Sequence, residues 1–155
     1  MKNKWIQFIN DEKYNKYFLS KEEKWDNYLH MVKQYINNHN NKPSRNDKID
    51  KTKKLAKWIE HQRENYNNKI GMMKDKKIYD KWTEFINNNK YKEYFLLSEQ
   101  KWDYYLFQLK TYIDTHNTKP LNCDKNLQIK KLANWINTQQ TSYKNKKDMM
   151  KNEII

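Results

Sequence analysis

The sequence contains very little glycine, proline or cysteine, and each shortage excludes a class of structure. One glycine and two prolines in 155 residues argue against β-hairpins and glycine-rich phosphate loops, because those turns need residues that tolerate positive φ. The single cysteine, Cys123, has no partner for an internal disulfide, so a reducing, intracellular environment is expected. No run of about 18 apolar residues is present, which argues against a membrane-spanning or secreted protein.

Basic and aromatic residues are abundant instead. The formal net charge is +13, and 33% of the residues are charged against 36% that are hydrophobic. That balance is typical of disorder, but six Trp, 12 Tyr and five Phe supply large apolar surfaces at regular positions. The length allows one medium domain or two small ones. We therefore expect a folded chain of one or two domains.

The chain is an internal duplication with a period of 77 residues. Shifting the sequence by 77 positions gives 38 identities over 77 aligned residues, with no insertion. All six tryptophans pair in this alignment: Trp5 with Trp82, Trp25 with Trp102, and Trp58 with Trp135. Self-similarity at a fixed period is the signature of a repeat architecture. The predicted units are residues 1–77 and 78–155.

The periodicity within each unit is helical. Apolar residues recur at i, i+3, i+4 and i+7, which places them along one face of a helix. The first unit shows such stripes over 5–9, 25–36 and 55–66, and the next copy begins over 78–86. Ser20 and Glu23 predict a capping box at the start of the second helix. We predict an all-α fold made of two tandem small helical bundles.

Two further segments have a distinct expected structure. The Asn-rich segment 37–47, which holds Pro43, is expected to be an ordered loop. Residues 13–19 are expected to form a short helical turn. The Met pairs at 72–73 and 149–150 are interpreted as packing residues.

The sequence does not determine at which helix each repeat unit begins. The chain begins with the helix around Trp5 and reaches Ile155 just before a third copy of that helix would start. The helix can therefore either begin each unit or end each unit of a longer array. In both cases the segment 78–87 joins the two halves and is expected to pack on at least one of them.

Positive charge is concentrated in the same part of both units. Residues 42–63 hold eight basic and three acidic residues, and residues 119–140 hold four and one. The segment 20–39 is neutral when His is uncharged. On a helix, Lys53, Lys54 and Lys57 lie opposite the apolar stripe. A basic helix after a basic loop is typical of a nucleic-acid-binding module, although a solvated face that only keeps the protein soluble is the simpler alternative.

The residues that we expect to contact nucleic acid combine these lysines with arginines and amides that suit phosphates and base edges. They are Lys42, Arg45, Lys48, Lys53, Lys54, Lys57, Arg63, Lys119, Lys125, Lys130, Lys131, Asn134 and Gln140.

The pattern Lys-Leu-Ala-x-Trp-Ile-x-x-Gln-x-x-x-Tyr, at 54–66 and again at 131–143, resembles the helicase-associated domain. Tandem copies of this three-helix module occur behind some bacterial helicases and in repeat proteins of large DNA viruses. The resemblance covers nearly the whole chain, and it implies nucleic-acid binding. The expected location is intracellular, in the cytoplasm, the nucleus, or a viral particle or factory.

Other chemistry has little support in the sequence. The paired tryptophans lie at stripe positions, so we expect core packing rather than base stacking, with Trp58 and Trp135 as buried hubs. Cys123 and His116 have no further ligand nearby for a zinc site. No P-loop or nucleophile motif is present. We expect no catalytic residue, metal or cofactor.

Nucleic acid, DNA before RNA, is the expected partner, with no membrane and no small-molecule substrate. A structural or protein-interaction repeat protein, such as a scaffold or virion component, is the alternative, followed by a small enzyme of unrecognised type. The feature that favours a scaffold is the lower net charge of the second unit, +4 against +9 in the first.

Overall fold

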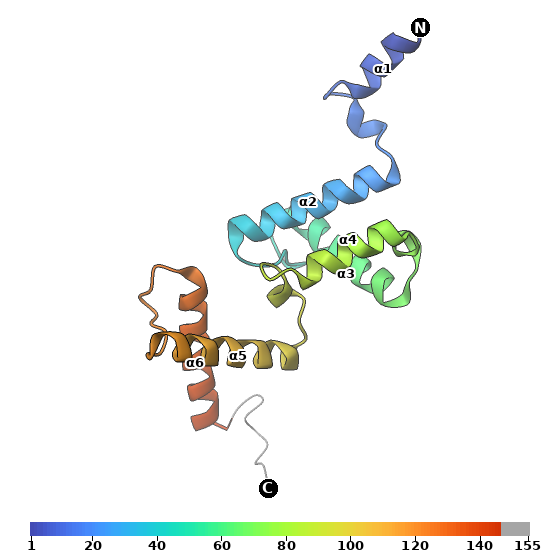
Figure 1. The fold of residues 1–155 in the computed structure, drawn as a ribbon. Helices are drawn as coiled ribbons and strands as arrows, with labels where there is room; N and C mark the ends of the chain where they lie inside the picture. The colour runs from blue at the N-terminus through green and yellow to red at the C-terminus, as the bar shows by residue number, and fades with distance from the viewer. Residues whose placement is uncertain (147–155) are drawn as a thin grey trace. The chain divides into compact units, whose positions relative to one another are not determined.

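A computed structural model describes residues 1–146 of the protein. Over these residues the fold is all-α, with six α-helices, three short 3-10 helices and no strand, which confirms the predicted class. The α-helices are α1 (Lys2–Asn10), α2 (Lys21–His39), α3 (Asp50–Asn68), α4 (Lys76–Asn87), α5 (Ser98–His116) and α6 (Leu127–Lys144) (Figure 1). The 3-10 helices are η1 (Asn15–Tyr17), η2 (Gly71–Lys74) and η3 (Lys92–Tyr94). The predicted packing of Met149 and Met150 lies outside the described residues.

The chain divides into two compact units, Met1–Phe95 and Leu96–Ile155. The predicted boundary at residue 77 follows the sequence repeat, whereas the compact units follow packing. The difference arises because α4, which opens the second sequence copy, packs within the first compact unit. We call the two compact units unit 1 and unit 2.

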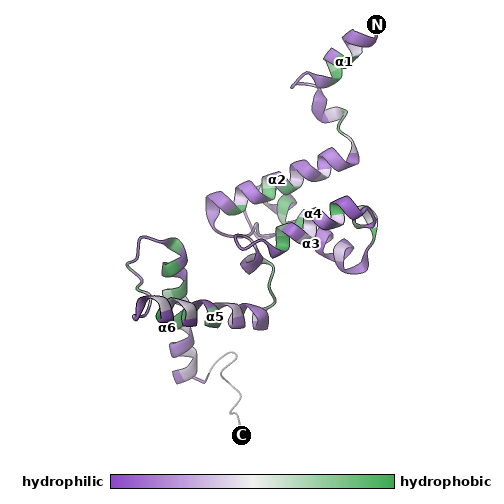
Figure 2. Ribbon diagram, in the orientation of Figure 1, coloured by the Kyte–Doolittle hydropathy of each residue, from purple (hydrophilic) through white to green (hydrophobic). Residues whose placement is uncertain are grey.

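Unit 1 has a continuous hydrophobic core between α2, α3 and α4. Its centre holds Val32, Ile59 and Trp82, each 1% exposed or less, and Met73 of η2 is buried beside them. Hydrophobic and hydrophilic residues alternate along these helices (Figure 2), as expected for helices with one buried face. The core therefore depends on the stripes that the sequence predicts.

The ends of α2 follow from local chemistry. The Ser20 hydroxyl accepts from the Glu23 backbone N–H at 3.1 Å, and a Glu23 carboxylate oxygen accepts from the Ser20 N–H at 2.7 Å, which confirms the predicted capping box. The predicted loop start at Asn37 is wrong, because α2 continues to His39. Its C-cap is Asn40, whose left-handed φ of 49° suits an asparagine cap.

Trp58 is less buried than the predicted hub. It is half-buried, and its ring lies 5.7 Å from both Trp25 and Tyr28 of α2 and 5.9 Å from Trp82 of α4. Trp58 thus contacts α2, but the fully buried indole rings of unit 1 are those of Trp25 and Trp82. The reason is that Trp58 lies at the edge of the α3 apolar stripe, whereas Leu55 and Ile59 lie at its centre.

Unit 2 repeats the helix pair of α2 and α3 in α5 and α6. The Trp102 indole N–H donates to Gln139 Oε1 at 3.0 Å, as Trp25 donates to Gln62 at 2.8 Å. Tyr105 stacks on Trp135 at 5.6 Å, as Tyr28 stacks on Trp58. Trp135 is half-buried, so its predicted role as a buried hub is also wrong.

No helix among residues 1–146 is long and apolar enough to cross a membrane.

Candidate nucleic-acid interface

The basic surface of unit 1 is built on α3, whose opposite face is committed to the core. Leu55, Ile59 and Gln62 face inward and are at most 4% exposed. The helix period then places Lys51, Lys54 and Lys57 outward at i, i+3 and i+6, and all three are exposed. We call these three residues the α3 lysine row.

Lys51 was not among the residues predicted from the sequence. The signal for it was present, since Lys51 stands three residues before Lys54 and six before Lys57. Lys53, which was predicted, is half-buried, and its ammonium lies 3.5 Å from the Asp50 carboxylate. The structure therefore places Lys53 at the border of the outward face rather than opposite the apolar stripe.

The loop before α3 adds further cations beside this row. Lys48 is exposed, Lys42 is half-buried, and the Arg45 guanidinium pairs with Glu60 of α3. The Ile49 N–H donates to the Asp47 carboxylate at 2.8 Å, so the loop has a defined local structure.

Acidic residues interrupt the basic surface toward the end of α3. Glu60 and Glu64 are exposed on the same helix, and Arg63 is half-buried between them, about one turn after Glu60. Asp50 stands at the start of the helix. Exposed pairs such as Arg45–Glu60 contribute little stability. The strongest local excess of positive charge is thus the first half of α3 together with Lys48.

The corresponding surface of unit 2 is less charged but has no acid on its helix. Helix α6 contains three lysines and no Asp or Glu. Lys130, Asn134 and Gln140 are exposed, whereas Lys131 is half-buried. Lys119 and Lys125 are exposed in the preceding loop. The outward face of α6 is therefore richer in amides than in charge.

No three His, Cys, Asp or Glu side chains come together as metal ligands would within residues 1–146. His39 and His116 instead stack on Tyr35 and Tyr112, with ring centroids 4.2 Å apart in both cases. Each His Nδ1 lies 2.9 Å from the carbonyl oxygen of that tyrosine. Both histidines are therefore part of the last turn of a helix.

Comparison of the chain with protein-family models, with curated proteins and with solved structures gave no match. The resemblance to the helicase-associated domain stays a prediction that depends on the residues quoted for it.

Proposed function

We propose that the protein is a non-catalytic nucleic-acid-binding protein that contacts phosphates through the basic loop and helix of each repeat. The observation that carries this proposal is the α3 lysine row with Lys48 beside it. Phosphate contacts from lysine supply most of the affinity in such complexes without sequence preference. The row lies on the face of α3 that core packing leaves unused, so packing among the described residues does not require its charge.

The proposed architecture is a tandem pair of small helical modules derived from the 77-residue duplication. The matched Trp–Gln hydrogen bonds and Tyr–Trp stacks of the two helix pairs support it. Two basic modules on one chain increase overall affinity if both reach the same strand. We expect unit 1 to contribute more, because residues 42–63 hold twice as many basic residues as 119–140.

The decisive experiment measures how binding depends on salt. Affinity for a duplex falls with salt at a log–log slope of about −0.9 per phosphate contact. Replacing Lys51, Lys54 and Lys57 together by Ala should therefore flatten the slope by roughly 2–3 units. Fluorescence anisotropy with a fluorescent duplex at several salt concentrations gives the slope, and circular dichroism verifies that helicity is kept.

A matched control removes the same charge elsewhere. Lys24, Lys74 and Lys90 are exposed lysines of unit 1 outside α3 and its loop. Their triple alanine variant has the same net charge as the lysine-row variant, so non-specific attraction is equal in both. Equal salt slopes for the two variants would show that α3 is not the binding surface.

The alternative is a scaffold or protein-interaction repeat protein, and the exposed aromatic residues of α1 favour it. Trp5 is 56% exposed and Phe8 is 40% exposed. Titrations with single-stranded probes and with an acidic polypeptide separate the two functions. Binding of the polypeptide as tight as that of nucleic acid would favour an acidic protein as the partner.

A further inference from the structure

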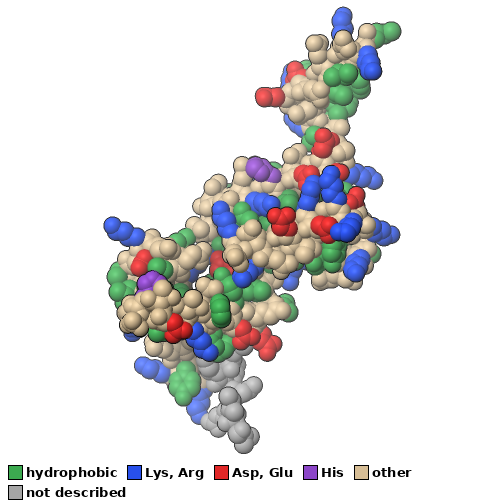
Figure 3. Space-filling view, viewed as in Figure 1, with side chains coloured by type: hydrophobic (Ala, Val, Ile, Leu, Met, Phe, Trp, Pro, Cys, Tyr) green, Lys and Arg blue, Asp and Glu red, His purple; other side chains and the backbone are tan. Residues whose placement is uncertain are grey.

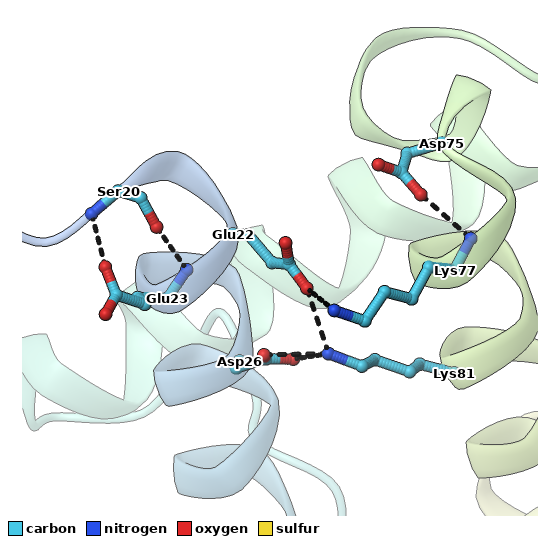
Figure 4. Close-up of polar contacts among 7 residues, drawn as sticks. All are labelled: Ser20, Glu22, Glu23, Asp26, Asp75, Lys77 and Lys81. Carbon is cyan, nitrogen blue, oxygen red and sulfur yellow. Dashed lines mark hydrogen bonds and ion pairs between the residues drawn. The ribbon is translucent and has the colours of Figure 1, made fainter.

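In unit 1, the segment from α4 to η3 covers one side of the α2–α3 helix pair. Trp82 of α4 is fully buried, with its ring edge-on to Trp58 at 5.9 Å. The Lys81 ammonium lies 2.8 Å from the Asp26 carboxylate (Figure 4). Tyr91 completes the cover, because its hydroxyl donates to Asn37 Oδ1 at 3.3 Å. This segment is the third part of the unit 1 core.

The 77-residue repeat places a second copy of this covering segment at the N-terminus, in α1 and η1. The two copies have the same internal ring packing. Trp5 meets Phe18 edge-on at 5.6 Å, as Trp82 meets Phe95 at 5.9 Å. Phe8 lies 4.8 Å from Tyr14, as Phe85 lies 5.0 Å from Tyr91. The segment α1–η1 is therefore already shaped as a cover.

Among the described residues of unit 1, the α1 copy nevertheless covers no core. Helix α1 has no buried residue, and Trp5 is 56% exposed where its counterpart Trp82 is 0% exposed. Figure 3 shows hydrophobic side chains gathered along one side of α1. An exposed cluster of this kind on a preformed helix indicates an interaction surface.

The repeat also provides a second copy of the covered face, in α5 and α6. Helix α5 has no buried residue, whereas its counterpart α2 has four. Ile113 is 40% exposed, but its counterpart Ile36 is 2% exposed. A groove of about 280 Å³, lined by Trp102, Trp135 and Ser142 among others, lies between the two helices. Trp58, the unit 1 counterpart of Trp135, is the ring that Trp82 of α4 meets.

The polar partners match as well as the apolar ones. Lys4 corresponds to Lys81, and the Asp26 and Glu22 that hold Lys81 correspond to Asp103 and Glu99. Docking α1 on α5–α6 would therefore recreate the same ion pairs.

Two further contacts have counterparts. Tyr14 corresponds to Tyr91, and its hydroxyl would meet Asp114 where Tyr91 meets Asn37. Lys110 corresponds to Lys33, whose ammonium lies 5.5 Å from the Phe85 ring, and would lie over Phe8. The hydroxyl of Thr83 is the exception, because Ile6 stands in its place.

We propose that α1 and η1 of one copy dock on the α5–α6 face of a second copy of this chain, as α4 and η3 dock on α2 and α3. The occupant is a second copy because the chain carries both the cover and the face, with matched aromatic and charged partners. The two surfaces differ, so the contact is heterologous and produces a ring or an open filament. This inference does not depend on nucleic-acid binding.

The first test is the mass of the nuclease-treated full chain as a function of concentration. Sedimentation equilibrium from about 1 μM to about 1 mM covers the affinities expected of such a contact. The weight-average mass should rise above that of the monomer. Trp5→Ala should weaken association at least about tenfold, as expected for a buried tryptophan anchor. A chain that stays monomeric over the whole range would overturn the proposal.

The second test separates specific docking from non-specific association. Lys4→Glu and Asp103→Lys should each weaken association alone, whereas an equimolar mixture of the two variants should regain it. In the mixture, the new carboxylate of the first variant can face the new ammonium of the second. The native Lys4 of the second variant can likewise face the native Asp103 of the first, so both contacts are restored. Closure within one chain would leave the wild type monomeric in the first test, and non-specific aggregation would not be rescued by mixing.

A charge-matched control completes the design. Lys24 is exposed on α2, outside the elements of the proposed contact, so Lys24→Glu changes the net charge as Lys4→Glu does without altering a predicted contact. It should associate as the wild type does. If Lys24→Glu weakens association as much as Lys4→Glu, or if the mixture is not rescued, the proposed docking is wrong.

Discussion

At the scale of single residues, Trp82 is the side chain on which unit 1 depends most. It is 0% exposed and contacts Trp58, Phe85 and Phe95. Trp82→Ala should lower the free energy of unfolding by about 3–5 kcal/mol through the cavity it leaves. Trp82→Phe should cost less, because no acceptor for the indole N–H exists among the described residues and no hydrogen bond is lost.

Urea denaturation of both variants, with Trp5→Ala at a dilution where the chain is monomeric, measures this prediction. Trp5 is exposed, so Trp5→Ala should be close to the wild type. A loss in Trp5→Ala as large as that in Trp82→Ala would show that α1 belongs to the unit 1 core.

The Trp–Gln hydrogen bonds offer a comparison of one contact in two environments. Gln62 is 3% exposed, and Gln62→Ala leaves the Trp25 N–H buried without an acceptor, which should cost about 1–3 kcal/mol. Gln139 and Trp102 are half-buried, so water can replace the lost acceptor in Gln139→Ala. Urea denaturation should show a smaller loss of stability for Gln139→Ala than for Gln62→Ala. Equal losses would mean that water reaches the Trp102 N–H no better than the Trp25 N–H.

At the scale of helices, a small ion network joins α2 to α4. Hydrogen bonding and charge from Lys77, and more weakly from Lys81, lower the pKa of Glu22 (Figure 4). The hydrogen bond with Asp26 raises the pKa of Lys81, with a smaller contribution from Glu22. Glu22 therefore stabilises unit 1 above the ordinary glutamate pKa of about 4.3, and this contribution is lost as the pH falls through the lowered pKa.

The sign for Lys81 is opposite. Its contribution is fully present below the ordinary lysine pKa of about 10.4 and is lost as the pH rises through the raised pKa. Both contributions are therefore present at neutral pH, and both decrease with salt because the side chains are partly exposed.

Glu22→Gln should consequently lower the urea midpoint at pH 7 and have little effect at about pH 2, where the wild-type carboxyl is also neutral. Glu12→Gln, at an exposed glutamate of unit 1, is the control and should be close to neutral at both pH values. A difference between wild type and Glu22→Gln that is independent of pH would exclude the ion pair as its cause.

Helix positions could be predicted from the sequence, but helix partners could not. Periodicity and the Ser20–Glu23 box define α2, and the stripe at 55–66 defines the face of α3 that is buried. Periodicity does not say which third helix covers that face, because the segments around Trp5 and Trp82 have the same pattern. For the same reason the boundary of the compact unit at Phe95 was not foreseen.

The candidate interface was predictable to a similar degree. Charge counts located the basic loop and helix, and the helix period placed Lys54 and Lys57 outward. The positions of the other predicted cations depend on local ion pairs. Asp50 engages Lys53, and Glu60 engages Arg45, and these pairings depend on side-chain geometry that spacing alone does not give.

At the scale of the whole molecule, the two units should differ in stability. Unit 1 buries a three-helix core, whereas in unit 2 only Leu132, Ala133 and Ser142 of α6 are buried within its described helices. Amide hydrogen exchange on the monomer should therefore be faster throughout α5 and α6 than at the centres of α2, α3 and α4. Protection of α5 equal to that of α2 at low concentration would mean that another segment already covers it.

The row of three indole rings in unit 1 gives the protein an optical consequence. Trp25 and Trp82 flank Trp58 at 5.7 and 5.9 Å, close enough for their electronic transitions to couple and to contribute an exciton signal to the circular dichroism spectrum. Unit 2 has only the pair formed by Trp102 and Trp135, at 6.0 Å, among its described residues. Any event that brings a third indole onto that pair would be visible as a new band, without a label and in the intact chain.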